Sequence, residues 1–287
     1  MIRVGVAGWD YPDWVGPVYP STEARHIDRL AFLARYVDVL EVNSTFYRPA
    51  SPHTARSWVR RAPPALRFSA KIHRAITHDR AEPSPESFEP TLAGLRPLLD
   101  EGRLLALLVQ FPHSFRFDDA GKRRLEAIAE GLSGWPWVVE VRHAEWEGAR
   151  AVEWLAQLGA GWCVVDQPRI GATARATPRV LGSLGYLRLH GRNAANWFRE
   201  DAGRDARYDY LYAGDEIEDL AGIARTMAEQ AAELIVVQNN HFRGQALVNA
   251  LQLKHRLTGA RPAAPQTLVE AYPALSDEVR VERQRLF

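Results

Sequence analysis

Hydrophobic residues along the chain are concentrated in eight short segments, each long enough for one β-strand. The segments are residues 2–8, 38–43, 66–72, 104–111, 137–142, 161–167, 186–191 and 234–240. Most are separated by stretches in which apolar residues recur every three or four positions, the spacing of an amphipathic helix. These predicted helices span residues 52–62, 86–100, 119–132, 149–159, 216–233 and 243–259. Ser51 and Asp118 or Asp119 are suited to cap two of their amino termini.

Eight nearly continuous apolar strands, each paired with a helix, favour a parallel sheet covered by helices on one face. A doubly wound open sheet is the main alternative, and it usually has a glycine-rich phosphate loop after its first strand. Here the first strand leads into GWDYPDWVGPVYP, which is too rich in Trp, Tyr and Pro for that turn. The sequence therefore predicts an α/β fold, a single-domain (β/α)8 TIM barrel over residues 1–287. We expect residues 260–287 to be a C-terminal extension packed on the barrel.

Long connections follow three of the predicted strands, at residues 9–27, 168–183 and 191–215. Long loops in a compact domain are often functional. With the strands assigned in this way, the first and last of these connections lie at the carboxyl end of the barrel, where barrel enzymes have their active sites.

Composition limits the classes of protein that fit. No apolar run approaches the roughly 18 residues of a membrane span, and the first residues form a predicted strand rather than a secretory signal. We therefore expect a cytoplasmic protein with no membrane partner. The single cysteine, Cys163, lies in an apolar strand and excludes an intramolecular disulfide. The net charge of +1 provides no general attraction for nucleic acid, so any basic surface must be local.

Polar residues spaced two apart mark the carboxyl ends of several predicted strands, as in YLRLHGR, where Arg188 and His190 follow Tyr186. Side chains two apart share one face of a strand. That face must be the barrel lumen, because the opposite face meets the helices. The helix-facing residues are then Leu40, Val42, Ala70, Ile72, Val139, Val141, Leu187 and Leu189. The predicted ring at the mouth of the lumen comprises Glu41, Lys71, Gln110, Glu140, Arg142, Asp166, Arg188, His190 and Asn239. Such a ring needs mutual charge compensation or a ligand.

Seven ordered motifs give the chain a family resemblance. They are GW near the start, EVNSTFYR at 41–48, the Lys71 strand with ITH at 76–78, QFP at 110–112, VEVRHAEW at 139–146, RLHGR at 188–192 with Trp197, and NN at 239–240 with the small and apolar residues that follow. In these motifs the chain resembles the YecE-like family, the domain of unknown function 72. The resemblance implies a (β/α)8 barrel related in fold to xylose isomerase and endonuclease IV, and it implies no activity.

The residue types at the mouth favour a metal-free site for an anionic ligand. Lys71, Arg142, Arg188 and Arg192 could hold a phosphate or carboxylate, since arginine offers a two-pronged match to either. Glu41 or Glu140 could act as general base and His190 as general acid. The prediction is an enzyme, its class left open with hydrolase as one option, that acts on a small phosphorylated or otherwise anionic substrate by acid/base chemistry without a cofactor. The predicted catalytic residues are Glu41, Lys71, Glu140 and His190. The predicted ligand-binding residues are Asn43, Tyr47, Gln110, Arg142, Asp166, Arg188, Arg192, Trp197, Asn239 and Asn240.

Two alternatives stay open. In the first, Glu140, Asp166 and His190, with Glu41, hold a divalent metal such as zinc or manganese, as in a phosphodiester hydrolase or sugar isomerase. The cations in the same ring would repel that metal. In the second alternative the protein binds a metabolite or nucleic acid without catalysis, using aromatic residues such as Trp197 and the arginines of the loop at 191–215.

Overall fold

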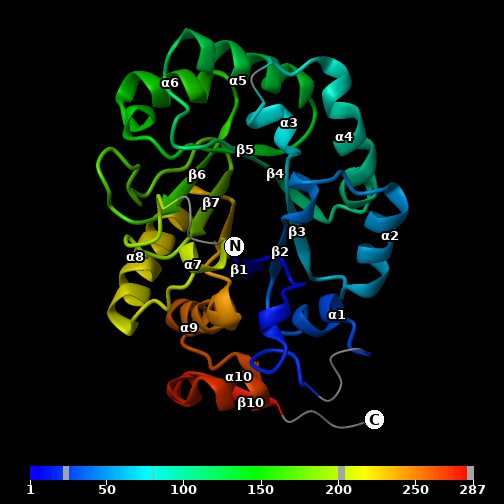
Figure 1. The fold of residues 1–287 in the computed structure, drawn as a ribbon, viewed down its shortest axis with the longest axis vertical. Coiled ribbons are helices and arrows are strands. Elements are labelled where there is room, and N and C mark those ends of the chain that lie inside the picture. Colours follow the sequence, from blue (N-terminus) through cyan, green and yellow to red (C-terminus); the bar gives the residue numbers. More distant parts are fainter. Residues whose placement is uncertain (22–25, 80, 200–203, 283–287) are drawn as a thin grey trace.

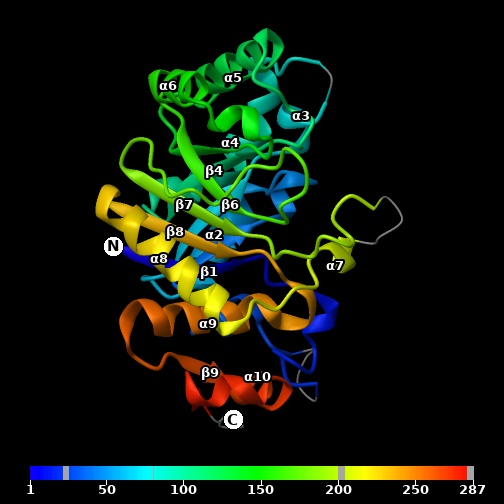
Figure 2. The ribbon, with the colours of Figure 1, turned by 90° about the vertical axis from the view of Figure 1, so that its left-hand side faces the viewer.

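A computed structural model describes residues 1–21, 26–79, 81–199 and 204–282. Eight parallel strands follow one another in chain order around a closed barrel, which β8 closes by pairing with β1 (Figures 1 and 2). The strands are β1 (Ile2–Ala7), β2 (Val39–Val42), β3 (Arg67–Lys71), β4 (Leu104–Gln110), β5 (Trp137–Glu140), β6 (Gly161–Asp166), β7 (Leu184–Leu189) and β8 (Glu233–Gln238). All eight predicted strands and the (β/α)8 TIM-barrel fold are confirmed.

Helices surround the barrel. They are α1 (Arg29–Leu33), α2 (Pro52–Arg61), α3 (Arg74–Thr77), α4 (Pro85–Asp100), α5 (Asp119–Gly131), α6 (Ala149–Gln157), α7 (Arg204–Arg207), α8 (Gly214–Gln230) and α9 (Gln245–Thr258). The Ser51 hydroxyl accepts the Thr54 N–H at the start of α2, and the Asp118 carboxylate accepts the Gly121 N–H at the start of α5. Both caps agree with the sequence prediction. None of these described helices is long and apolar enough to cross a membrane.

One strand-plus-helix unit lacks its helix, at the long connection that the sequence predicted between the sixth and seventh strands. Residues 167–183, between β6 and β7, contain no helix. Pro168 and Pro178 each remove a backbone donor that a helix would need. The segment instead lies over the loop after β5, where Ala174 N–H donates to the Arg142 carbonyl at 2.8 Å.

The strands separate two apolar layers. The side chains predicted to face the helices, from Leu40 to Leu189, all belong to the large core between barrel and helices. The alternate side chains fill the lumen: Ala7, Val39, Ala106, Leu108, Val138, Cys163, Val165, Tyr186, Ile235 and Val237. Cys163 is therefore a buried packing residue. The alternation of the strands decides which polar residue reaches the lumen and which does not.

The C-terminal segment carries β9 (Ala263–Pro265), α10 (Gln266–Ala271) and β10 (Arg280–Glu282), and β9 pairs with β10. Figure 2 shows α10 and β9 below α9, at one end of the molecule. Leu268 is fully buried, and the Thr267 hydroxyl donates to the Val18 carbonyl at 2.8 Å. We propose that this extension folds with the barrel as one unit.

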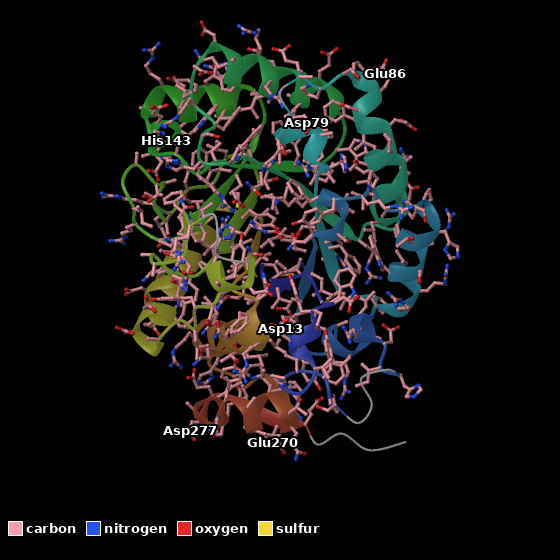
Figure 3. The ribbon with its side chains drawn as sticks, in the orientation of Figure 1. Asp13, Asp79, Glu86, His143, Glu270 and Asp277 are labelled. Atoms are coloured by element: carbon pink, nitrogen blue, oxygen red, sulfur yellow. The ribbon has the colours of Figure 1, made fainter. Side chains whose placement is uncertain are left out.

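Replacing Leu268 with Ala tests that proposal. Removing a buried leucine side chain should lower the free energy of unfolding by about 2–5 kcal/mol. Urea unfolding followed by far-UV circular dichroism and by tryptophan fluorescence should give one coincident transition. Glu270→Ala on the exposed face of the same helix (Figure 3) is the matched control and should cost far less. A separate early transition would show that the extension unfolds independently.

Candidate functional site

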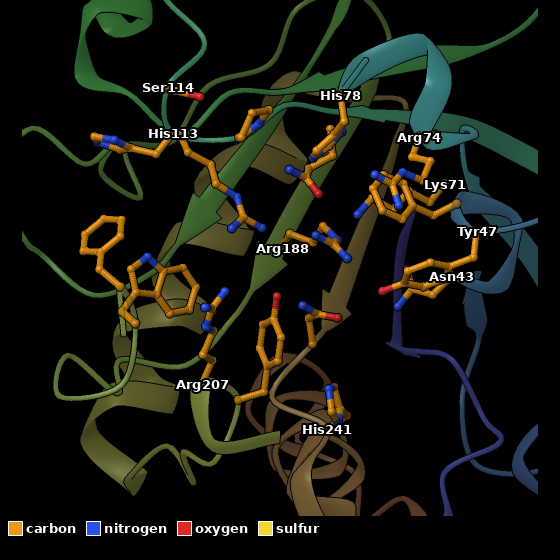
Figure 4. A pocket seen from close by; sticks show the side chains of 18 of the residues that line it. Asn43, Tyr47, Lys71, Arg74, His78, His113, Ser114, Arg188, Arg207 and His241 are labelled. Atoms are coloured by element: carbon orange, nitrogen blue, oxygen red, sulfur yellow. The ribbon is translucent and has the colours of Figure 1, made fainter. Parts of the chain in front are cut away.

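A pocket of about 780 Å³ opens at the carboxyl end of the barrel (Figure 4). Its wall is built from residues at and just beyond the ends of different strands. They are Asn43 after β2, Lys71 in β3, Gln110 in β4, Arg142 after β5 and Asn239 after β8. Each was predicted as a site residue, and the fold brings all five together.

Positive charge dominates the pocket wall. Five cationic side chains line it: Lys71, Arg74, Arg142, Arg188 and Arg207. Over the described part of the chain, the lining includes no aspartate or glutamate. The described wall therefore carries more positively than negatively charged side chains.

Aromatic side chains form much of the rest. Tyr47 and Phe198 are 63% and 50% exposed, so they stand at the rim. Trp197 is buried, and the Arg142 guanidinium carbon lies 5.7 Å from the centre of its ring. The pocket therefore offers both charge and apolar faces to a ligand.

Arg188 forms the floor of the pocket through a buried ion-pair network. Its Nε donates to Glu41 Oε2 at 2.8 Å and its Nη2 to Glu41 Oε1 at 2.6 Å. Its Nη1 donates to Glu140 Oε2 at 2.8 Å. Tyr186 adds a hydroxyl donor to Glu41 at 2.8 Å. Neither glutamate lines the pocket, because both lie fully buried behind Arg188.

Arg142 and His190 complete this network around Glu140. Arg142 Nε donates to Glu140 Oε1 at 2.9 Å, and His190 Nε2 lies 3.3 Å from the same oxygen. The Asn239 amide donates to His190 Nδ1 at 2.8 Å. These contacts fit a neutral His190 that carries its proton on Nε2. Two carboxylates are thus matched by two guanidinium groups, and the network is neutral overall.

The buried groups have displaced pKa values. Burial alone would raise the pKa of Glu140, but the charges of Arg188 and Arg142 outweigh it and hold that pKa well below its usual range. Burial lowers the pKa of His190 to about 3, against the opposing effect of Glu140. The folded protein therefore holds an ionised Glu140 and a neutral His190 at pH 7.

Lys71 differs from the other predicted catalytic residues because it lines the pocket. Its Nζ lies 3.7 Å from the centre of the Phe46 ring. Burial lowers the pKa of Lys71 to about 7, and the charge of Arg188 adds to this effect. A substantial fraction of the amine is therefore unprotonated near neutral pH.

Three predicted site residues lie elsewhere. Val165 fills the lumen, so its neighbour Asp166 points outward, and the prediction that Asp166 belongs to the lumen ring is wrong. Asp166 instead accepts two donors of Arg192, at 2.9 and 3.0 Å, and the Tyr212 hydroxyl at 2.6 Å. Arg192 also pairs with Glu216 of α8 at 2.7 Å and does not line the pocket.

Asn240 also faces outward and lies outside the pocket. Its amide donates to the Tyr210 carbonyl and to Asn249 of α9, both at 2.8 Å. Asp166, Arg192 and Asn240 therefore anchor the ends of β6, β7 and β8 to the surrounding helices, and their predicted role in holding a ligand does not fit the geometry.

The sequence analysis missed several pocket residues. Arg74 begins α3, three residues after Lys71, where a charged residue in a short loop helix carries no distinctive signal. Arg207 was noted only as part of a basic loop. His78, His113 and His241 also line the pocket and were not among the predicted site residues.

The residues present do not fit a divalent metal. Within the described ranges, no three His, Cys, Asp or Glu side chains lie close enough together to hold one. Glu41 and Glu140 are committed to Arg188, and Asp166 points away from them.

A closed (β/α)8 barrel with a cationic pocket at its carboxyl end is the class of protein that this geometry defines. The family model described as "Protein of unknown function DUF72" matches residues 3–271, and the chain belongs to this family, as its motifs indicated.

Solved structures and a curated relative agree with this assignment. A DUF72 family protein from Thermotoga maritima is 32% identical, with a TM-score of 0.79 over 90% of this chain and 99% of that one. A DUF72 family protein from Enterococcus faecalis is 27% identical, with a TM-score of 0.78 over 90% and 95% of the two chains. The UPF0759 protein YunF of Bacillus subtilis is 27% identical over 269 residues, which cover 88% of this chain and 93% of that protein.

Replacing Arg188 with Met should destabilise the fold, because it leaves two buried carboxylates without their main partner. The expected loss is about 3–5 kcal/mol in the free energy of unfolding, measured by urea titration. Arg96→Met, which removes an exposed pair with Asp100, should cost less than about 1 kcal/mol. Adding Glu41→Gln and Glu140→Gln to Arg188→Met should restore part of the lost stability. Equal free energies of unfolding for Arg188→Met and Arg96→Met would contradict the importance of the buried ion-pair network for the fold.

His190 should make the protein less stable in mild acid. The unfolded chain protonates this histidine below its ordinary pKa of 6.5, whereas the folded pKa is about 3. The unfolded state therefore binds the extra proton in this window, and stability falls as pH decreases from 6.5 towards 3. Compared with His190→Gln, the wild type should lose on the order of 1 kcal/mol more per pH unit between pH 6.5 and 5. Parallel profiles for the two proteins would contradict a neutral buried His190.

Proposed function

We propose that the protein is an enzyme that acts on a small phosphorylated or carboxylated metabolite in the pocket at the carboxyl end of the barrel. One observation carries this proposal: five cationic side chains line the pocket and no described acidic side chain lines it. The proposal includes a cytoplasmic location for the protein.

The charge balance supports an anionic ligand. Glu41 and Glu140 compensate Arg188 and Arg142 beneath the pocket. Lys71 and Arg74 have no ion pair with any described residue, so their charges add to the pocket without internal compensation. A phosphate or carboxylate would supply the missing negative charge, and arginine can bind either through two parallel hydrogen bonds.

Unsatisfied polar atoms in the wall point to the same conclusion. Asn43 Oδ1 and His113 Nε2 are buried, and neither has a hydrogen-bond partner in the described part of the chain. Buried polar atoms are normally paired, so these two favour a polar ligand or bound water. The pocket volume and the rings of Tyr47, Trp197 and Phe198 suit an organic body attached to the anion.

The geometry favours Lys71 for proton exchange with the ligand. Glu41, Glu140 and His190 were predicted as general base and acid, but all three lie behind Arg188. Lys71 reaches the pocket and has a pKa of about 7, which is close to the optimum for acid/base catalysis at neutral pH.

Anion binding tests the proposal directly. Inorganic phosphate and sugar phosphates should raise the melting temperature and should give a calorimetric dissociation constant that weakens with added salt. Arg142→Gln removes one charged donor and should weaken binding about 10- to 100-fold. Arg96→Gln, on the outer surface of α4, should bind as the wild type does. If phosphate neither binds nor stabilises the wild type, the proposed anion site is wrong.

A further inference from the structure

Lysine is rare in this chain. Only three of its 36 lysine and arginine residues are lysines: Lys71, Lys122 and Lys254. Lys122 lies 3.7 Å from the Asp119 carboxylate, and Lys254 donates to Asp38 at 2.9 Å. Both have ordinary ion-pair roles.

Lys71 has no such role. The structure gives its Nζ no hydrogen bond and no ion pair with any residue in the described ranges, although the side chain is half-buried. Its neighbour is the face of the Phe46 ring, at 3.7 Å. Glu140 and Glu41, the two carboxylates whose charges act on Lys71, are held by Arg188.

The other cationic side chains that line the pocket in the described part of the chain are all arginines: Arg74, Arg142, Arg188 and Arg207. Arginine keeps its proton in proteins, whereas a buried lysine can lose one and become a nucleophile. A site that needed only a fifth cation would be served as well by arginine, which this chain uses almost everywhere else.

We propose that Lys71 is a covalent nucleophile, whose Nζ forms an imine with the carbonyl carbon of an anionic aldehyde or ketone. The substrate class is then a 2-oxo acid or a phosphorylated carbonyl compound. This inference rests on the proposed function, because the arginines must hold the anionic group while the amine reaches the carbonyl. Figure 4 shows Lys71 and Arg207 on opposite sides of the pocket, with Arg188 between them.

The chemical step needs no oxidant or metal. The lone pair of the neutral amine attacks the carbonyl carbon, and the C=O π electrons move to oxygen. Proton transfer from nitrogen to oxygen gives a carbinolamine. The hydroxyl then takes one further proton from the solvent that fills the open pocket, the carbon–oxygen bond breaks to release water, and the nitrogen lone pair forms the C=N bond of a protonated imine. A protonated imine withdraws electrons from the adjacent carbon, so the chemistry that follows takes place there.

The environment of Lys71 suits this step. An amine with an ordinary lysine pKa of 10.5 would be almost fully protonated at pH 7, whereas desolvation and the charge of Arg188 bring the pKa of Lys71 to about 7. Desolvation and a neighbouring cation are the two ways in which proteins activate lysine for imine formation. The Phe46 face favours the ammonium and so opposes complete loss of the proton.

Reductive trapping tests the proposal. The full chain is incubated with glyoxylate or glycolaldehyde phosphate and cyanoborohydride, which reduces an imine to a stable secondary amine. Intact mass and peptide mapping should find one adduct per chain, at Lys71, and the rate should rise with pH and level off above about 7. Propionaldehyde, which lacks an anionic group, should label Lys71 at least tenfold more slowly.

Two matched variants separate the nucleophile from a binding cation. Lys71→Arg keeps the positive charge and should bind inorganic phosphate within about threefold of the wild type, yet should give no adduct in the pocket. Lys122→Arg should label at Lys71 as the wild type does. Labelling spread evenly over Lys71, Lys122, Lys254 and the Met1 amine would overturn the proposal. If the wild type binds phosphate but gives no trapped adduct, the proposal that Lys71 is a nucleophile is wrong and the proposed function still stands. If it neither binds phosphate nor gives an adduct, the proposed function is wrong as well.

Discussion

The buried ion pairs of Arg188 are the interaction on which the rest of the site depends. They join β7 to β2 through Glu41 and to β5 through Glu140, across the lumen of the barrel. Glu41 and Arg188 are 147 residues apart in sequence. A shift of one residue in any of these strands would move its side chain out of the lumen and leave a buried charge unpaired. Burying these charges contributes little stability in itself, but a wrong register would be costly, so the network helps to specify the register of the barrel.

The same network divides the polar ring into two levels with different roles. At the lower level, charges cancel and hydrogen bonds are shared among Glu41, Glu140, Arg188 and Arg142. At the upper level, Lys71, Arg74 and Arg207 face an open pocket that no described carboxylate lines. Because the glutamates are already bound, the pocket remains cationic even though acidic residues lie directly beneath it.

The sequence was sufficient for the barrel and for much of the ring. Strand length, helical spacing and the paired polar positions placed Glu41, Lys71, Glu140, Arg142 and Arg188 in the lumen correctly. The prediction for Asp166 was wrong because both faces of the strand GWCVVD carry apolar residues. No pair of polar residues therefore marked the face that points into the lumen. The two levels could not be predicted either, because they depend on which long side chain reaches which partner across the barrel. That pairing depends on contacts between strands distant in sequence, which periodicity does not report.

Arg188 also links the fold of the barrel to the chemistry of the pocket. Its charge is fixed by Glu41 and Glu140, and the geometry of β7 holds it at the floor of the pocket. Burial is the main cause of the lowered pKa of Lys71, and from the floor of the pocket the charge of Arg188 adds to it. A free arginine side chain could move away or be screened by water, but one held by three hydrogen bonds to two carboxylates cannot. The interaction that specifies the barrel therefore also contributes to the lowered pKa of the lysine above it, which couples the reactivity of the pocket to the correct folding of three distant strands.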